Sequence, residues 1–281
     1  MKLNPKADLF IPDGVALPEA ITRTTHLGIG AHQDDLEFMA YHGIAACYQQ
    51  KNKWFGGVIV TDGKGSSRAG IYKDWTDEQV AAERVQEQRR AAQMGEYSFI
   101  AQLGFPSKDV RDAKATATRV DLQTILTLSK PEVVYLHNPA DKHHTHVGVT
   151  LRTIEAMRAM PAADRPKRVL GCEVWRSLDW LLDADKHVMP VSSRLDLAAA
   201  LNGAFATQIA GGKRYDLAVM GRRLSNATFF DAYTSDNETH LQWAMDLTPL
   251  VQDPSLDIEA YTLSFVDRLK ADISSTIRKS L

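Results

Sequence analysis

The chain has 281 residues, of which 44% are hydrophobic and 24% charged, the composition of an ordinary globular protein with a sizeable core. Its formal net charge of -2 excludes a general attraction to nucleic acid or to an anionic membrane surface, so we expect neither as a partner. Cys47 and Cys172 form no CxxC pair and are expected to be reduced. No signal peptide is recognisable and no apolar run reaches about 18 residues, so we expect a cytoplasmic protein without a membrane span.

Short apolar segments alternate with amphipathic ones along the first half of the chain. Strands are predicted at 26–32, 55–63, 97–105 and 132–138, and helices at 36–51, 76–94, 121–130 and from about 146 onward. Because the strands are almost continuously apolar and alternate with helices, they predict an α/β fold with a mainly parallel, Rossmann-like sheet and helices on both faces. Ligands bind at the carboxyl ends of the strands in such sheets.

The predicted helix at 76–94 has recognisable ends. Thr76 and Gln79 have the spacing of a capping box, in which each side chain bonds to the backbone N–H of the other residue. Gly95 directly follows the last predicted helical residue and is the expected C′ residue.

The second half of the chain is less regular. A strand is expected at 168–175, and helices at 196–208 and 257–278. No Pro-, Gly- or Ser-rich linker separates the two halves. We therefore expect a single domain over 1–281, with a core at about 24–160 and a C-terminal elaboration at 161–281.

The stretch GIGAHQDDLEF, residues 28–38, places a histidine and three acidic residues directly after a predicted buried strand. Its two glycines begin a GxGxxG dinucleotide loop, but Gln33 stands where the third glycine belongs. Asp34 and Asp35 are also suited to the solvated N-terminus of a helix. A third interpretation is a metal site, in which the glycines only allow close packing of the strand.

A metal site needs further ligands, and residues 137–149 (HNPADKHHTHVGV) contain four of the nine histidines of the chain. His32 and Asp35 lie three residues apart across a strand-to-helix turn, so both side chains can reach one cation. One more histidine completes a set of two His and one carboxylate with open positions, which is typical of catalytic zinc. Asp34, next to a ligand, would then be free to act as a base toward metal-bound water.

On these residues, the sequence resembles the PIG-L/LmbE-like family of zinc-dependent de-N-acetylases, which act on N-acetylglucosaminyl conjugates. The AHPDD motif of the family stands here as AHQDD at 31–35, and its D-x-H-x-D-H motif as DKHHTH at 141–146. Two further segments agree, TDGKGSSRAG at 61–70 and RVQEQRRAAQMG at 84–95. The resemblance is firm over about 26–160 and weak thereafter.

The resemblance implies a role for each residue of the two motifs. His32, Asp35 and His146 would bind Zn²⁺, and Asp34 would be the general base toward the metal-bound water that acts as nucleophile. His143 would stabilise the oxyanion and protonate the departing amine. The implied reaction is the hydrolytic removal of an N-acetyl or other N-acyl group from an amino sugar or its conjugate.

Four further residues are candidates for contact with the substrate. Arg84 belongs to the helix segment that agrees with the family. Lys64 replaces a glutamate in a loop at the rim of the site, which indicates an anionic or otherwise altered substrate. Asp141 can compensate for the family carboxylate that Thr145 replaces, and Trp175 follows the end of a predicted strand.

Two other classes of function stay open on the sequence. One is a non-catalytic metal- or sugar-binding protein with the same fold, although such a protein would need the ligands and not the spare carboxylate of Asp34. The other is a nucleotide-binding oxidoreductase. Two His and one Asp also accept iron or cobalt in place of zinc. The expected partner is a small N-acetylated amino sugar or glycoconjugate. Because members of the family it resembles often assemble, we also expect a homo-oligomer.

Overall fold

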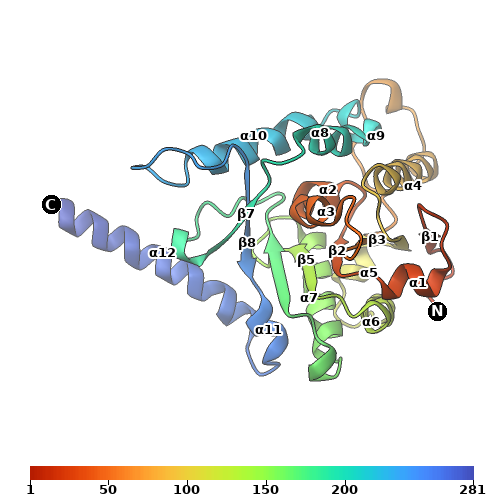
Figure 1. Ribbon diagram of the computed structural model, residues 1–281, viewed down its shortest axis with the longest axis horizontal. Helices are drawn as coiled ribbons and strands as arrows, with labels where there is room; N and C mark the ends of the chain where they lie inside the picture. Colours follow the sequence, from red (N-terminus) through yellow and green to blue (C-terminus); the bar gives the residue numbers. More distant parts are fainter.

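The computed structural model describes all 281 residues and is built around one eight-stranded sheet with the order β1-β4-β3-β2-β5-β6-β8-β7 (Figure 1). The strands are β1 (Asp8–Phe10), β2 (His26–Gly30), β3 (Phe55–Thr61), β4 (Ile100–Phe105), β5 (Val133–His137), β6 (Arg168–Cys172), β7 (Lys186–Pro190) and β8 (Leu241–Asp246). The five central strands from β4 to β6 are parallel, whereas β1 joins one edge and β8 and β7 the other in antiparallel pairing. The predicted mainly parallel sheet is therefore confirmed, and three antiparallel strands extend it.

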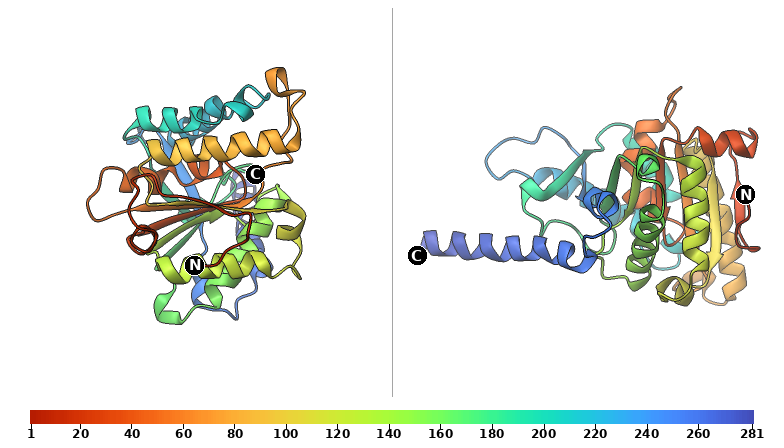
Figure 2. Two further views of the ribbon diagram at one scale, coloured as in Figure 1. Left: turned by 90° about the vertical axis from the view of Figure 1, so that its right-hand side faces the viewer. Right: turned by 90° about the horizontal axis from the view of Figure 1, so that it is seen from below.

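Helices cover both faces of the sheet, which the left view of Figure 2 shows nearly edge-on. The helices are α1 (Leu17–Thr22), α2 (Asp35–Met39), α3 (Tyr41–Cys47), α4 (Asp77–Met94), α5 (Ser107–Arg111), α6 (Ala117–Ser129), α7 (His144–Arg158), α8 (Leu195–Gly203), α9 (Ala206–Ile209), α10 (Tyr215–Thr228), α11 (Thr248–Gln252) and α12 (Ile258–Ser280). One face carries α1, α6 and α7, and the other carries α2, α3, α4, α8 and α10.

Alternate residues of the central strand β2 face two separate cores. Leu27 and Ile29 pack with residues of α6 and α7 in one core. The glycines between them face α2, and a Cβ on Gly28 would lie only 2.8 Å from the ring of Phe55 and 2.9 Å from Leu36. The glycines of the GIG stretch therefore allow α2 to approach the sheet closely, which confirms their interpretation as close-packing strand residues.

The helix predicted to follow β2 is broken into α2 and α3, which meet at Ala40. The side-chain amide of Gln242 from β8 enters the break, where it donates to the carbonyl of Phe38 at 2.6 Å and accepts from the backbone N–H of His42 at 3.0 Å. The guanidinium of Arg223 from α10 donates to the same carbonyl at 3.1 Å. Because these partners come from the far end of the sequence, the local pattern does not reveal the break.

Helix α4 begins as predicted and ends slightly differently. The backbone N–H of Thr76 donates to the side chain of Gln79 at 2.8 Å, and the N–H of Gln79 donates to the Thr76 hydroxyl at 3.2 Å, which confirms the capping box. Gly95 is the C-cap with φ of -84°, and the left-handed conformation falls on Glu96 with φ of 51°. A Cβ on Gly95 would collide with the ring of Tyr97, which accounts for the glycine there.

Two expectations from the composition can be compared with the structure. Cys47 and Cys172 are both buried and unpaired, as expected for reduced thiols. None of the helices has both the length and the apolar character needed to cross a membrane.

The last helix, α12, projects from the body of the molecule (Figure 1, and right view of Figure 2). Thr262 and Phe265 are its only buried residues and Arg268 pairs with Asp185 at 3.0 Å, so the helix leaves the body after its third turn. Its apolar side chains repeat at helical spacing along one face and are exposed, namely Leu263, Val266, Ile273 and Ile277. An exposed apolar stripe of this kind is typical of a helix that packs on a partner.

His42, near the start of α3, is expected to make the stability of the fold depend on pH. Its Nδ1 lies 3.0 Å from the hydroxyl of Tyr135, and burial, together with the nearby charges of His187, His26 and Arg168, lowers the pKa of His42 from 6.5 to about 4. The unfolded chain therefore takes up a proton at His42 below pH 6.5, and the folded chain only near pH 4. Acidification through this window lowers the free energy of unfolding by up to about 3 kcal/mol.

Replacing His42 by Gln tests this expectation, with the exposed His144→Gln as the matched control. The free energy of unfolding is measured in urea at pH 7.5 and pH 5. Between these pH values the wild type should lose about 2 kcal/mol more than His42→Gln, whereas His144→Gln should follow the wild type. An equal loss in the wild type and in His42→Gln would contradict the assignment.

Candidate metal centre and substrate cavity

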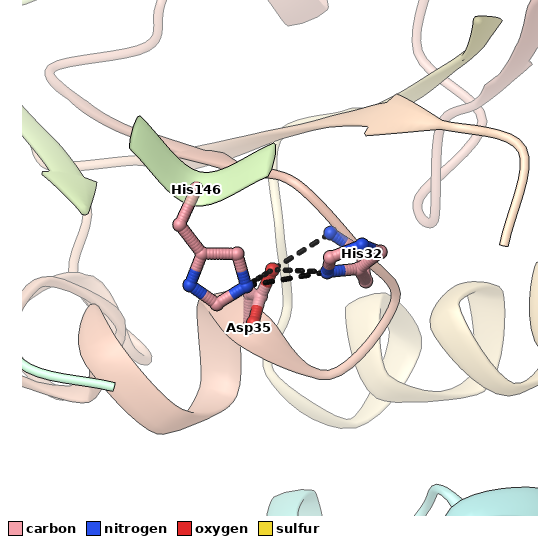
Figure 3. A group of neighbouring side chains, drawn as sticks. All are labelled: His32, Asp35 and His146. Atoms are coloured by element: carbon pink, nitrogen blue, oxygen red, sulfur yellow. Dashed lines mark hydrogen bonds and ion pairs between the residues drawn. The ribbon is translucent and has the colours of Figure 1, made fainter. Parts of the chain in front are cut away.

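Three side chains from separate elements meet at the carboxyl end of β2 (Figure 3). His32 lies in the turn after β2, Asp35 is the first residue of α2, and His146 lies in the first turn of α7. Nδ1 of His32 is 3.3 Å from Oδ2 of Asp35, and Nε2 of His146 is 3.5 Å from the same oxygen and 3.3 Å from Nδ1 of His32. The structure thus brings together the three residues that the sequence indicates as ligands.

The spacing of these atoms fits a zinc ion. Zinc binds imidazole nitrogen and carboxylate oxygen at about 2.0–2.1 Å in tetrahedral geometry, which separates neighbouring ligand atoms by about 3.4 Å. The three distances of 3.3 to 3.5 Å agree with this requirement. Three protein ligands leave a fourth position open, and His32 and Asp35 line a cavity through which a second molecule can reach it.

A carboxylate behind His146 orients its ring. Nδ1 of His146 is 3.4 Å from Oδ2 of Asp141, so its proton faces that carboxylate and the Nε2 lone pair faces the other two ligands. Asp141 also accepts the backbone N–H groups of His143 at 3.0 Å and of Trp175 at 3.2 Å. The structure therefore places Asp141 behind the ligands and outside the lining of the cavity, not at the substrate contact indicated by the sequence.

His137, the last residue of β5, also lies against the site. Its Nε2 accepts the backbone N–H of Ala31 at 3.0 Å and lies 3.4 Å from Oδ2 of Asp35, and its ring stacks on His146 with centroids 3.7 Å apart. Because its Nε2 already accepts an N–H group, we assign His137 to packing behind the ligands. Two signals in the sequence point to it, its position at the end of a predicted parallel strand and its place in the histidine-rich segment 137–149.

Asp34 is not part of the ligand group and instead meets Arg84 of α4. Its backbone φ of 105° lies in the region that favours glycine, so the turn between β2 and α2 is strained at this residue. Oδ2 of Asp34 is 3.6 Å from Nη2 of Arg84. Burial raises the pKa of Asp34 well above its ordinary value, and the charge of Arg84 opposes this effect. Both side chains line the cavity, where they can act on a bound molecule.

The side chain of Gln33 makes a hydrogen bond that the proline of the family motif could not make, and its backbone carbonyl makes a second one. Its Nε2 donates to Oε1 of Gln102 in β4 at 3.1 Å, and its carbonyl accepts from Arg84 at 2.6 Å. A Cβ on Gly63, which has φ of 69°, would lie 2.5 Å from Oε1 of Gln33. Gln33 thus ties the turn that carries Asp34 to β4 and to α4, and the glycine after β3 leaves room for it.

Arg84 and Glu87 do not pair with each other along α4. Glu87 is buried, and its carboxylate accepts the backbone N–H of Thr207 at 2.7 Å and the hydroxyl of Thr207 at 2.5 Å. The next residue, Gln208, lines the cavity. Glu87 therefore fixes α9, an element of the C-terminal half, beside the metal centre.

The cavity has a volume of about 400 Å³ and is lined by both halves of the chain. One side is formed by the turn at residues 32–35 (HQDD), by α4 and by the loop after β3. The other side is formed by α9, by α10 and by the segment after β6. The two sides differ in chemistry. The metal ligands and Asp34 lie on the first side, and most of the cationic side chains lie on the second. The cavity is therefore completed only by residues beyond the two histidine-containing motifs.

His143 and Trp175 form the wall next to the ligands. The ring of His143 lies 5.0 Å from that of His32 and stacks on that of Trp175 at 6.2 Å between centroids. Burial, with smaller contributions from His146 and His32, lowers the pKa of His143 to about 4, so its ring is neutral at pH 7. Nδ1 of His143 is buried and has no hydrogen-bond partner, and the residue as a whole lines the cavity.

The remaining candidates divide into two groups. Arg84 and Trp175 line the cavity, whereas Lys64 does not. Nζ of Lys64 pairs with Glu78 at 3.0 Å, and both side chains are exposed. The altered charge of this loop is thus directed outward in the structure.

Several lining residues have no counterpart in the sequence analysis. Lys213, Tyr215 and Arg222 belong to α10 or to the segment just before it, and α10 itself is not among the predicted helices. Residues 215–228 do have a helical pattern of apolar positions, which is the signal that could have located them.

Solved structures similar to this one show the same fold. The 4-carboxy-2-hydroxymuconate hydratase GalB from Pseudomonas putida KT2440 is 17% identical with a TM-score of 0.63, and the match covers 80% of this chain and 95% of that one. N,N'-diacetylchitobiose deacetylase from Pyrococcus horikoshii is 13% identical with a TM-score of 0.60, covering 82% and 86% of the two chains. The A40926 pseudoaglycone deacetylase is 16% identical with a TM-score of 0.57, covering 80% and 97%. No curated protein sequence matches the chain.

A family match covers the part of the chain that holds both histidine-containing motifs. Residues 27–157 match the family described as PIG-L, GlcNAc-PI de-N-acetylase. This range begins within β2 and ends within α7, so it includes His32, Asp34, Asp35 and His146 together with the parallel core of the sheet. The resemblance to the PIG-L family is therefore confirmed over residues 27–157.

Proposed function

We propose that the protein is a zinc-dependent hydrolase that removes an N-acetyl or other N-acyl group from an amino sugar or its conjugate. The observation that carries the proposal is the site itself: three ligand atoms 3.3 to 3.5 Å apart beside a cavity, with the separate carboxylate of Asp34 facing the same cavity. A protein that only binds a metal or a sugar has no use for that strained, buried carboxylate. The GxGxxG interpretation loses support because the glycines serve packing.

His32, Asp35 and His146 would hold the metal. When bound, zinc supplies Lewis-acid chemistry, since it polarises an acyl carbonyl and makes hydroxide available near neutral pH. Asp141, behind His146, keeps its ring in the tautomer that presents Nε2 to the ligand group.

Asp34 and His143 carry the proton transfers and the charge stabilisation of the proposed reaction. Asp34 accepts a proton from the attacking water while Arg84 holds its carboxylate in place. As the amide C–N bond breaks, that proton passes to the departing nitrogen, and the products are a free amine and a carboxylate. His143 lines the cavity beside the ligands, a position that suits a hydrogen bond to the acyl oxygen as negative charge develops there. The resemblance also assigns protonation of the amine to His143, although the neutral ring favours the first role.

The matched family is named for de-N-acetylation of GlcNAc-PI, and two of the structural neighbours are named as deacetylases of N,N'-diacetylchitobiose and of the A40926 pseudoaglycone, which supports the proposed class of substrate. A third neighbour is named as a hydratase, so the fold accommodates more than one reaction. The assay must therefore detect the products of amide hydrolysis directly.

The test measures acetate and free amine released from N-acetylglucosamine, N,N'-diacetylchitobiose and larger N-acetylated glycosides. Protein stripped of metal by a chelator should be inactive, and addition of one equivalent of zinc, iron(II) or cobalt(II) should restore release, with the best metal identifying the cofactor. Full activity of the metal-free protein would overturn the metal-dependent mechanism. Absence of acetate from every substrate, with water added across a double bond instead, would replace the proposed reaction.

We also propose that two copies of the chain associate through α12. A helix without tertiary contacts is marginal in water, so the projecting part of α12 requires a partner. The charges at its two ends are opposite, with Asp257 and Glu259 at the start and Arg278 and Lys279 at the end, whereas both signs occur in between. An antiparallel pair of α12 helices would bury both apolar stripes and place opposite charges side by side.

Light scattering of the full chain should give twice the monomer mass, and Ile273→Glu in the apolar stripe should give the monomer mass. Ala271→Glu, on the opposite face of the same helix, is the matched control and should remain dimeric. A monomeric wild type, or a dimer that both variants leave intact, would exclude this interface.

A further inference from the structure

Four cationic side chains line the cavity, and two of them are already engaged. Arg84 faces Asp34 and also donates to the carbonyl of Gln33 and to the hydroxyl of Ser66. Arg223 is fully buried and donates to the carbonyls of Glu37 and Phe38 at the break between α2 and α3. These two cations therefore hold the structure of the site together.

The other two cations, Lys213 and Arg222, have no anionic partner. Nζ of Lys213 lies 5.2 Å over the ring of Trp175 and makes no hydrogen bond or ion pair within the chain. The guanidinium of Arg222 makes one hydrogen bond, to the carbonyl of Val174, which leaves its other N–H groups without partners in the chain. Both cations thus flank the same short segment, Val174 and Trp175, on the side of the cavity formed by the C-terminal half.

Glu173 is the one acidic lining residue on that side, and it is committed elsewhere. Its carboxylate accepts the side-chain N–H of Asn226, the backbone N–H of Leu178 at 3.1 Å and the backbone N–H of Trp243 at 3.4 Å. The residue is 4% exposed; burial raises its pKa, and the nearby charge of Arg222 opposes this effect. Neither Lys213 nor Arg222 forms an ion pair with it, so both retain positive charge for a bound molecule.

The space around Arg222 extends beyond the cavity. A second hollow of about 500 Å³ shares Arg222 and Ala218 with the first and continues along α10; it is also lined by Asp179, whose carboxylate lies 3.9 Å from Nζ of Lys186. A substrate whose amide lies at the metal centre can thus reach past Trp175 and place a second group beside Arg222.

We propose that Lys213 and Arg222 form an anion subsite, and that the N-acylated substrate carries a carboxylate or a phosphate that these two cations bind. The inference rests on the proposed function, which places the amide of the substrate at the metal centre. It adds the requirement that the substrate also carries a negative charge. Charge-assisted hydrogen bonds from Arg and Lys are the usual means of recognising either anion. In this arrangement the metal centre performs the reaction and the subsite selects the substrate.

The test compares three probes of the same sugar: N-acetylglucosamine, N-acetylglucosamine 6-phosphate and N-acetylmuramic acid, which are neutral, phosphorylated and carboxylated. Their binding to the zinc-loaded full chain carrying Asp34→Asn is measured by calorimetry, so that no turnover is needed. We expect at least one charged probe to bind more than tenfold more tightly than the neutral one. Arg222→Gln should weaken its binding by about 10- to 100-fold, the range for loss of a charge-assisted hydrogen bond, and Lys213→Gln by a smaller factor.

Arg214→Gln is the matched control, because Arg214 is next to Lys213 in sequence, pairs with Asp216 and does not line the cavity. It should bind all probes as the parent does, and Arg222→Lys should recover part of the lost affinity. Charged probes that bind no better than the neutral one, or that bind equally well to Arg222→Gln, would overturn the subsite. Charge-dependent binding without acetate release by the wild-type zinc protein would support the subsite and count against the deacylase proposal.

Discussion

Asp34→Asn should lower kcat for acetate release by a factor of about 10² to 10⁴, the usual contribution of a general base. Asn has the shape of Asp and cannot accept the proton. The hydrogen bond of the Asp34 backbone N–H to Gln88 does not involve the side chain, so the turn should keep its form. Because Asp34 is not among the grouped ligands, the variant should bind one metal ion per chain like the wild type.

The measurement pairs steady-state acetate release with metal analysis of the same sample. Asp74→Asn, an exposed carboxylate in the loop before α4 that does not line the cavity, is the matched control and should retain full activity. Undiminished kcat in Asp34→Asn with zinc still bound would remove Asp34 from the mechanism and restore the interpretation of a binding protein.

Asp35→Asn should abolish zinc binding and, with it, the stabilisation of the fold by zinc. Oδ2 of Asp35 lies within 3.5 Å of the imidazole nitrogens of His32, His137 and His146. Although burial acts to raise the pKa of Asp35, His146 and His137 hold it well below its ordinary value, as an anionic ligand requires. A neutral amide removes the charge that a divalent cation needs in this buried position.

The readout is the Tm of the metal-free protein with and without added zinc. Zinc at about 100 times its Kd stabilises the wild type by about 2.7 kcal/mol, which raises Tm by several degrees, and it should leave the Tm of Asp35→Asn unchanged. Asp121→Asn is the control: this largely buried carboxylate accepts the N–H of Asn4, remote from the site, and its loss should lower Tm without reducing the response to zinc. A full zinc response in Asp35→Asn would place the metal elsewhere.

The parallel half of the fold follows closely from local sequence patterns. Its strands are apolar on both faces because helices cover both faces, so they stand out as continuous hydrophobic segments. The metal ligands could also be predicted from local patterns. His32 and Asp35 are three residues apart in one turn, and His146 lies in a cluster of histidines. The position of Asp34 relative to Arg84 is harder to predict from the sequence, because it depends on a backbone φ of 105° at Asp34 within that turn.

The antiparallel half could not be predicted in the same way. β7 pairs only with β8 at the edge of the sheet and is partly exposed, so its hydrophobic signal is weak. The break at Ala40 depends on Gln242, which is 200 residues from the N–H group that it accepts. Lys213 and Arg222 become visible as a pair only when α10 is placed beside the segment that follows β6. We propose that both halves form the single domain expected from the sequence, since β8 pairs directly with β6.

The shared lining of the cavity has a consequence for how such an enzyme can diversify. The groups that would break the amide bond come from the first 146 residues, whereas the unpaired cations come from residue 213 onward. Substitutions in the C-terminal part can therefore change the substrate selectivity while the residues that carry the reaction stay unchanged. Such changes must preserve the hydrogen bonds that connect the two parts of the chain, namely those of Thr207 to Glu87 and of Gln242 to Phe38. A chimaera that exchanges α10 but keeps those hydrogen bonds should change its preferred substrate without losing its metal.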